Sequence, residues 1–130
     1  MMAPEVYEEA RANAPIHVQL IRIGGDPMRG RIAGRIVRIF RDRDHQVHWG
    51  QRIAFMADVI DRSQSGPPVL SGTLYQDGER LERARWLEAF LEMWNGELQL
   101  VRSQLVPVRH PTWRPVCGPD LKGFLGPIPS

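Results

Sequence analysis

The densest group of potentially reactive side chains is the run from Asp42 to His48 (DRDHQVH). Imidazole and carboxylate groups together suit borderline divalent metals, and a loop can bring ligands from neighbouring positions to one point. The candidate ligands are Asp42, Asp44, His45 and His48. Arg43 lies among them and would repel a cation, and polar runs of this kind are also typical of solvated turns. A metal site and a plain turn both fit this run.

A second group combines arginines with aromatic rings between residues 31 and 52. Single-stranded nucleic acid is bound by cations that follow its phosphates and by flat rings on which bases stack. The candidate binding face comprises Arg31, Arg35, Arg38, Arg41, Arg43, Arg52 and Trp49, with Phe40 close by. In a strand of period two, Arg31, Arg35 and Arg41 share one face and Arg38 falls out of phase with them, and Phe40 fits a core position better. The alternative is an arginine-rich outer sheet face that meets only solvent.

Catalytic signatures do not occur in the sequence. It contains no G-x-S-x-G nucleophile turn, no H-E-x-x-H zinc motif and no phosphate-binding glycine loop. Cys117 and His110 are the one nucleophile and base that lie near each other, and they fall in a proline-rich stretch where no fixed contact is expected. Because Cys117 is the only cysteine, an intramolecular disulfide and a thiolate zinc cluster are excluded. We therefore expect a non-enzymatic protein and predict no cofactor.

Composition indicates one ordinary globular domain. Of the 130 residues, 42% are hydrophobic and 25% charged, which is too apolar for a chain that is disordered by composition. The net charge of +2 forms no single-sign block, because the 15 acidic residues are interspersed with the basic ones. We expect no membrane-spanning segment and no targeting signal, and the chain reads as cytoplasmic. A mature exported domain that has lost its leader would begin in the same way, so the compartment stays open.

Apolar alternation predicts strands over residues 16–23, 31–41 and 51–60. The alternation slips around Val37, which predicts a β-bulge, and Gly34 marks a place where another backbone comes close. Residues 4–14 fit a short N-terminal helix that ends at Pro15. Residues 69–75 could form a short further strand.

The spacing of apolar residues predicts an amphipathic helix over residues 79–94. Asp77 suits its N-cap, and the stripe of Leu81, Ala84, Leu87 or Glu88, Leu91 and Trp94, with Trp86 and Phe90 beside it, would pack on a sheet. The pair Asn95-Gly96 would end this helix through the left-handed conformation that glycine allows. Residues 97–108 return to β character, either as one long bent strand or as two segments that meet near Arg102 and Ser103.

The order of three strands, a possible short strand, a helix and a further strand resembles the OB-fold, a small Greek-key barrel. This resemblance covers residues 16–108 and rests on the order of the elements. It implies a mainly β (α+β) domain, namely a five-stranded barrel with one helix packed on it. The organisation expected is an N-terminal helical arm (1–15), a barrel domain (16–110) and an irregular tail (111–130). An OB-like barrel would offer a face for single-stranded nucleic acid or for an oligosaccharide.

The tail contains apolar residues that must be covered, although its prolines exclude a regular element. Its candidate partner contacts are Trp113, Leu121, Phe124 and Leu125. They would lie against a protein partner, a second copy of the chain or the domain itself. Our first interpretation is therefore a non-enzymatic interaction domain. The alternatives are an OB-like binder of nucleic acid or oligosaccharide and a metal-binding protein that uses His45 and His48.

Overall fold

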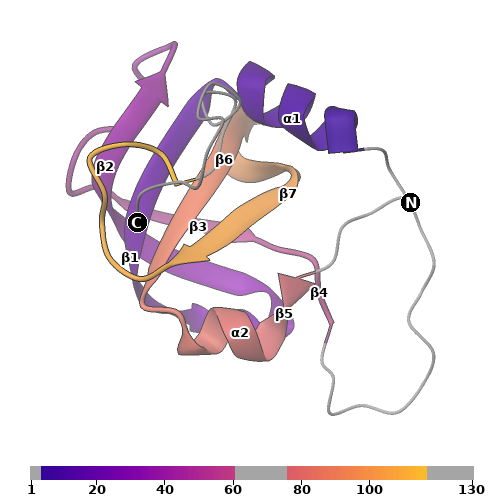
Figure 1. The fold of residues 1–130 in the computed structure, drawn as a ribbon. Coiled ribbons are helices and arrows are strands. Elements are labelled where there is room, and N and C mark those ends of the chain that lie inside the picture. Colours follow the sequence, from indigo (N-terminus) through magenta and orange to yellow (C-terminus); the bar gives the residue numbers. More distant parts are fainter. Residues whose placement is uncertain (1–3, 61–75, 117–130) are drawn as a thin grey trace.

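The computed structural model describes residues 4–60 and 76–116. Its helices are α1 (Pro4–Asn13), the single-turn η1 (Pro27–Arg29) and α2 (Gly78–Arg83). Its strands are β1 (Ile16–Asp26), β2 (Arg31–Asp42), β3 (Arg52–Met56), β4 (Val59–Ile60), β5 (Gln76–Asp77), β6 (Trp86–Trp94) and β7 (Glu97–Val108) (Figure 1). None of the described helices is both long enough and apolar enough to span a bilayer.

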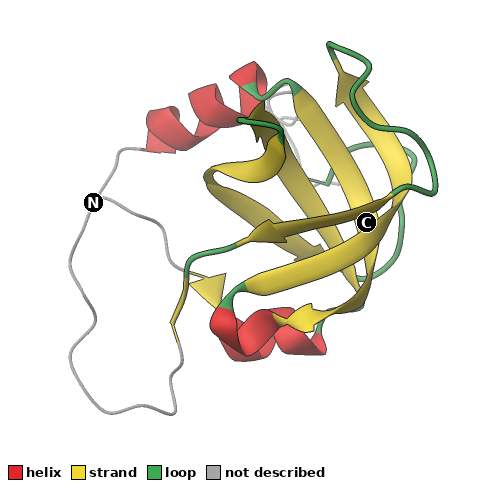
Figure 2. Cartoon of the chain, turned by 180° about the vertical axis from the view of Figure 1, so that it is seen from behind, coloured by secondary structure: helices red, strands yellow, loops and turns green. Residues whose placement is uncertain are grey.

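Five strands form one antiparallel sheet in the order β3-β2-β1-β6-β7. The sheet curls so strongly that its outer strands, β3 and β7, approach each other without being joined by hydrogen bonds (Figure 2). The helices α1 and α2 lie at opposite ends of it (Figure 1). The protein is thus mainly β with few helical residues, as predicted, but the closed barrel is not confirmed, because the sheet has two open edges.

The hydrophobic core lies on the inner face of the curled sheet. Successive side chains of a strand point to opposite faces, and along β1 the inward ones, Ile16, Val18 and Leu20, are fully buried. They pack with apolar side chains of the neighbouring strands and of α2, including Ile32, Ile36, Ile53, Phe55, Leu81, Leu87, Ala89, Leu91 and Leu105. The alternation that predicted the first three strands therefore reflects burial of one sheet face.

The predicted irregularity in the second strand is a β-bulge. Gln19 of β1 lies opposite Arg38, and Leu20 lies opposite Ile36, so Val37 has no partner in the ladder. The extra residue turns Arg38 to the outer face, which it shares with Gln19, instead of the inner face of Ile36. The bulge therefore brings Arg38, which strict alternation places out of phase, onto the same outer face as Arg35.

Gly34 allows the close approach between β1 and β2 that the sequence predicted. A Cβ atom at this position would collide with Leu20 Cδ1 and would lie 2.7 Å from the carbonyl oxygen of Ile21. In contrast, a Cβ atom at Gly24 would meet nothing closer than Ala33 Cβ at 4.0 Å. Only one of these two strand glycines is therefore required by packing.

The prediction of a helix over 79–94 is wrong beyond its first turns. Asp77 does cap a helix, since its carboxylate accepts a hydrogen bond from the Glu79 amide, but α2 ends at Arg83. Residues 86–94 form β6, which pairs with β1 over Trp86 to Leu91. Side chains on both faces of β6 are buried, so its apolar residues do not alternate clearly and imitate a helical stripe. Pairing with a strand distant in sequence outweighs local helix propensity here.

The Asn95-Gly96 pair forms a hairpin turn between β6 and β7, and its prediction as a helix C-cap is wrong. Both residues have positive φ, 50° and 81°, and Trp94 pairs with Glu97 across the two-residue loop. This is the geometry of a type I′ turn, for which Asn-Gly is the preferred sequence. The same dipeptide therefore reverses the chain between strands instead of ending a helix.

Residues 97–108 form one long bent strand, which is one of the two predicted alternatives. The bend lies at Arg102 and Ser103, whose φ angles of 50° and 57° interrupt the extended backbone. Pairing with β6 resumes beyond it, where Leu105 lies opposite Ala89. The N-terminal helix and the strands predicted over 16–23 and 31–41 are also found. The single strand predicted over 51–60 is interrupted, because β3 ends at Met56 and β4 (Val59–Ile60) pairs with β5 in a separate two-stranded sheet. Residues 69–75 lie outside the described part.

Replacing Gly34 with alanine should lower the free energy of unfolding by about 1–3 kcal/mol, because the added methyl group overpacks the β1–β2 contact. Gly24→Ala is the matched control, since the same methyl group fits there, and it should change stability by no more than about 0.5 kcal/mol. Urea unfolding of both variants measures the difference. Equal stabilities would show that the close approach at Gly34 is not a packing constraint.

Candidate binding cleft

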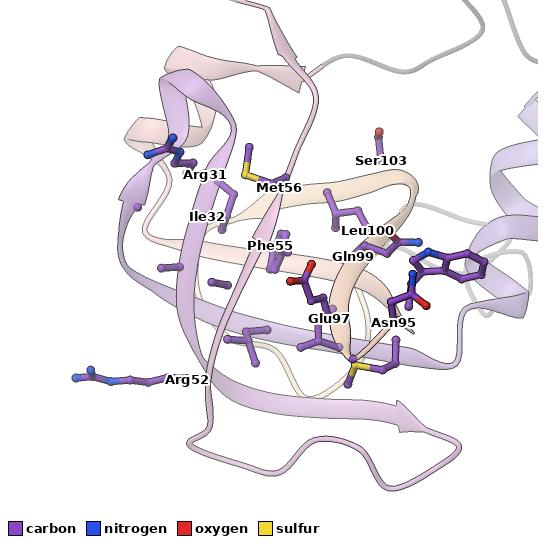
Figure 3. Close-up of a pocket in the computed structure, with 18 of the residues that line it drawn as sticks. Arg31, Ile32, Arg52, Phe55, Met56, Asn95, Glu97, Gln99, Leu100 and Ser103 are labelled. Carbon is purple, nitrogen blue, oxygen red and sulfur yellow. The ribbon is translucent and has the colours of Figure 1, made fainter.

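A cleft opens between the two edges of the sheet, with β2 and β3 on one side and the β6–β7 hairpin on the other (Figure 3). Its volume of about 990 Å³ lies at the upper end of the range for ligand pockets, which is about 300–1,000 Å³. The cleft is therefore large enough for a sizeable ligand.

Apolar side chains line much of this cleft. Ile53 and Phe55 of β3 are almost fully buried in the core beside it, and Leu98 and Leu100 of β7 are partly buried. Met56 and Trp94 also line the cleft, with 60% and 62% of their surfaces exposed. Large apolar side chains exposed next to a cleft are typical of a contact surface.

Several polar groups of the cleft already bind each other. Ser103 Oγ donates a hydrogen bond to Asp58 Oδ2 at 3.1 Å, and Gln99 Nε2 donates to Glu92 Oε1 at 2.8 Å. Glu97, which is exposed, lines the same cleft from β7. The two hydrogen bonds help to hold the β7 side of the cleft in place, and Glu97 is the one carboxylate that β7 contributes to its lining.

The main chain of β3 offers hydrogen-bonding groups to this cleft. The Ala57 amide donates to the Gly30 carbonyl at 2.7 Å, which fixes the phase of the β2–β3 ladder. Because antiparallel partners alternate between bonded and non-bonded pairs, Arg52, Ala54 and Met56 direct their amide and carbonyl groups away from β2. Within residues 4–60 and 76–116, β3 has no second neighbouring strand that would pair with these groups.

Three of the predicted nucleic-acid-binding arginines share one exposed face of β2 and β3. Arg35 lies directly opposite Arg52, and Arg31 lies opposite Met56, so all three guanidinium groups are on the outer side of the sheet. Arg35 Nη1 donates to the Gly50 carbonyl at 3.3 Å. Within the described residues, none of the three arginines forms an ion pair with a carboxylate. Like charges directly opposite each other destabilise a sheet, so a bound anion would relieve this repulsion.

The other residues predicted for that face are separated from these three. Arg41 Nη1 donates to the carbonyls of Arg11 and Ala14 at 2.8 and 2.7 Å, so it satisfies main-chain groups at the end of α1. The guanidinium group of Arg38 lies 4.5 Å from the ring centre of Trp113. Trp49 is 73% exposed in the turn before β3. The predicted arginines therefore fall into three groups. Arg31, Arg35 and Arg52 share an exposed face, whereas Arg41 caps α1 and Arg38 stacks on Trp113.

Arg43 also serves α1, because its guanidinium group donates to the Ala12 carbonyl at 3.0 Å. Phe40, predicted to be a core residue, is partly buried and lies edge-on to the His17 ring at 5.1 Å. Neither residue extends the arginine face.

The four predicted metal ligands occupy the turn after β2. The Asp42 carboxylate accepts hydrogen bonds from the Gln46 and Val47 amides at 2.9 and 3.0 Å, so it shapes the turn. Asp44, His45 and His48 are exposed. Among the described residues, no three His, Cys, Asp or Glu side chains gather closely enough to hold a metal ion. The metal hypothesis gains no support from this arrangement and stays a prediction.

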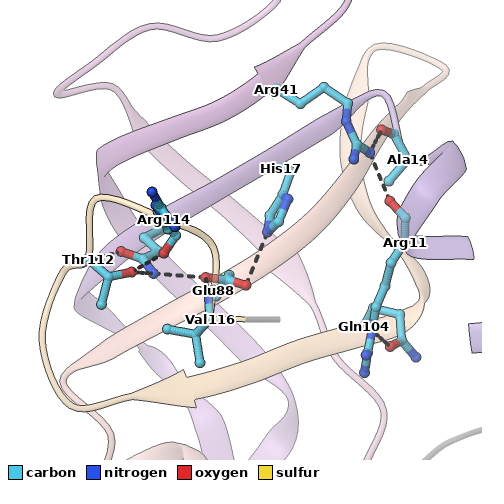
Figure 4. Close-up of polar contacts among 10 residues, drawn as sticks. Arg11, Ala14, His17, Arg41, Glu88, Gln104, Thr112, Arg114 and Val116 are labelled. Atoms are coloured by element: carbon cyan, nitrogen blue, oxygen red, sulfur yellow. Dashed lines mark hydrogen bonds and ion pairs between the residues drawn. The ribbon is translucent and has the colours of Figure 1, made fainter. Parts of the chain in front are cut away.

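A buried polar cluster lies on the outer face of the sheet, where the sequence predicted no site. His17, Gln19 and Glu88 have exposed fractions of 1%, 0% and 0%. His17 Nε2 lies 3.1 Å from Glu88 Oε2, and Gln19 Nε2 donates to Glu88 Oε1 at 2.8 Å (Figure 4). The His17 ring also stacks on Phe90 at 3.9 Å. Because these side chains are closed to solvent, the cluster is suited to structural support and not to catalysis.

The beginning of the tail covers this cluster. The Val116 amide donates to Glu88 Oε1 at 2.9 Å, and Thr112 both donates to and accepts from the Gln19 amide group, at 2.8 and 2.7 Å. Residues 111–116, which we call the strap, therefore pack on the protein's own sheet. Trp113, the first predicted partner contact, is 86% exposed beside Arg38, and its role toward a partner stays a prediction.

The remaining predicted residues of the tail, Leu121, Phe124 and Leu125, lie outside the described residues, and so does Cys117 of the pair with His110. Position along the sequence could not have identified the buried cluster, because Gln19 lies at a polar position of the strand predicted over 16–23 and Glu88 lies in the segment predicted to be a helix. Its one signal was the pair of carboxamide and carboxylate groups in otherwise apolar strands.

Comparison with known proteins gave no match: no protein-family model, curated sequence or solved structure is detectably similar to the chain.

Replacing Glu88 with alanine should lower the free energy of unfolding by about 3 kcal/mol, because it leaves the Gln19 side-chain amide and the Val116 backbone amide without their acceptor and removes the carboxylate that lies beside the buried His17 ring. Glu92→Ala is the control on the same strand, since this partly buried carboxylate has one hydrogen bond to Gln99, and it should cost about 1 kcal/mol. Urea unfolding gives both values, and hydrogen exchange at the Val116 amide reports on the strap. Unchanged stability and exchange in Glu88→Ala would contradict the role of this carboxylate.

Proposed function

We propose that the protein is a non-enzymatic, protein-binding domain that holds an extended segment of its partner against the open edge of β3. The observation that carries this proposal is the edge itself: the outward main-chain groups of Arg52, Ala54 and Met56 border a cleft lined by apolar side chains. Addition of a strand to a sheet edge is a common mode of peptide recognition, in which main-chain hydrogen bonds give affinity and side-chain pockets give specificity.

An OB-like scaffold is part of the proposal. The strand order, with α2 between β3 and β6, supports the resemblance to the OB-fold barrel. The domain differs from a closed barrel in that β3 and β7 are not joined by hydrogen bonds. Natural sheets usually protect long, exposed edges with charges, prolines or covering segments. In this domain a charged residue, Arg52, stands at the beginning of β3, and the cleft lies beside the edge. Such an edge is suited to accept a specific strand and to resist unspecific pairing.

Ala54→Pro tests this mode of binding, because proline removes the outward amide at the centre of the edge without removing a hydrogen bond to β2. Random peptides displayed on phage are the probe. The wild-type domain should enrich specific peptides, Ala54→Val should retain them, and Ala54→Pro should lose them while keeping a cooperative thermal transition. Absence of any enrichment by the wild-type domain, or equal binding by Ala54→Pro, would refute strand addition at β3.

Single-stranded nucleic acid is the second candidate ligand. It is favoured by the shared exposed face of Arg31, Arg35 and Arg52 and by the exposed rings of Trp49 and Trp94. Phosphates would neutralise the opposed arginines, and bases would stack on the indole rings.

On this alternative, a fluorescein-labelled dT oligonucleotide should bind at low salt with an affinity that falls steeply as salt rises. Arg35→Ala and Arg52→Ala should each weaken binding and lower the salt slope by about 1, whereas Arg80→Ala on α2 should change neither. Fluorescence anisotropy measures both quantities. No binding of the oligonucleotide at low salt would exclude this candidate.

A further inference from the structure

We infer that the segment bound at β3 is an acidic peptide strand in which glutamate or aspartate alternates with apolar residues. This inference rests on the proposed function, and it adds the chemistry of the partner. A strand added to β3 must direct alternate side chains to the outer and inner faces of the sheet, so each face selects one half of the partner's sequence.

The outer face selects for carboxylates. Arg35 and Arg52 are directly opposite each other, and Arg31 lies on the same face four residues further along β2, opposite Met56. No ion pair with a described carboxylate neutralises them. A strand next to β3 would place its outward side chains about 5 Å from Arg52 and about 10 Å from Arg35. A glutamate on that strand and an arginine of the sheet are together long enough to meet across these distances. Carboxylates there would remove the like-charge repulsion.

The inner face selects against charge. An inward side chain of the added strand would lie beside Ile53 and Phe55 and would face Leu98 and Leu100 across the cleft. A carboxylate at that place would lose water without gaining a cation, and Glu97 lines the same cleft with a like charge. The inward positions therefore favour residues such as valine and leucine, and the partner alternates between acid and apolar.

The main chain distinguishes a peptide from a nucleic acid. Both polymers could neutralise the three arginines, but only a polypeptide carries the regularly spaced amide and carbonyl groups that match those of Arg52, Ala54 and Met56. The length of β3, five residues, sets the paired stretch of the partner at about 17 Å. The open edge thus favours a short acidic peptide over an oligonucleotide.

A fluorescein-labelled peptide of alternating glutamate and valine, Glu-Val-Glu-Val-Glu-Val-Glu, tests the inference with the full chain. The peptide should bind in an anisotropy titration, and the block peptide Glu-Glu-Glu-Glu-Val-Val-Val, which has the same composition, should bind at least about tenfold more weakly. Arg35→Glu with Arg52→Glu should abolish binding of the acidic peptide and create binding of Lys-Val-Lys-Val-Lys-Val-Lys. Arg80→Glu paired with Arg83→Glu on α2 changes the net charge equally and should leave binding unchanged.

Several results would overturn the inference. If the block peptide bound as tightly as the alternating one, binding would depend on charge alone and not on pairing in a fixed strand register. If a dT oligonucleotide bound more tightly than either peptide, the arginine face would be assigned to nucleic acid. A dimer of the free protein that Ala54→Pro dissociates, seen by light scattering, would make a second copy the occupant of the edge. Peptides enriched from the phage library without alternating acids would refute only the inference, whereas absence of enriched peptides would refute the proposed function as well.

Discussion

The pairing of β6 with β1 is the interaction on which the rest of the structure depends. It joins the hairpin of β1 and β2 to the hairpin of β6 and β7, which are separated by more than forty residues in sequence. The same pairing buries Leu20 against Leu87 on the inner face and sets Gln19 against Glu88 on the outer face. Because the two hairpins curl toward each other from this central pair, their outer strands face each other across the cleft.

The two sides of the central pair have different chemical roles. Its inner side is apolar and supplies the nonspecific free energy of burial. Its outer side carries the buried polar side chains of Gln19 and Glu88, whose hydrogen bonds to Thr112 and Val116 fix the strap in one position, because losing them would leave buried polar groups without a partner. The strap thereby covers the centre of the sheet, whereas β3 has no second hydrogen-bonded neighbour among the described residues.

Much of the fold could be predicted from local patterns. The strands over 16–23 and 31–41, the bulge at Val37 and the close approach at Gly34 follow from alternation on one buried face and from the properties of glycine. The strand at 86–94 could not be predicted in this way, because both of its faces are buried and its leucine, alanine, glutamate and methionine residues favour a helix in isolation. The Asn-Gly turn was the signal that distinguished the two structures.

The site was less predictable than the fold. Arg31, Arg35 and Arg52 were predicted from the sequence as members of one binding face with Arg41. Arg41 instead donates to main-chain carbonyls at the end of α1, a contact that only the folded chain creates. Glu88 lies in the segment predicted to be a helix, and its burial beside Gln19 follows only from the pairing of β6 with β1. The open edge was not visible in the sequence at all, since it follows from which strands are outermost.

Amide hydrogen exchange along β3, measured by NMR on the free protein, tests the open edge most directly. The amides of Ala54 and Met56 should exchange rapidly, because they point away from β2, while those of Ile53 and Phe55 should be protected by the ladder. Protection of Ala54 and Met56 equal to that of their neighbours would mean that the edge is already paired, and it would contradict a binding site there.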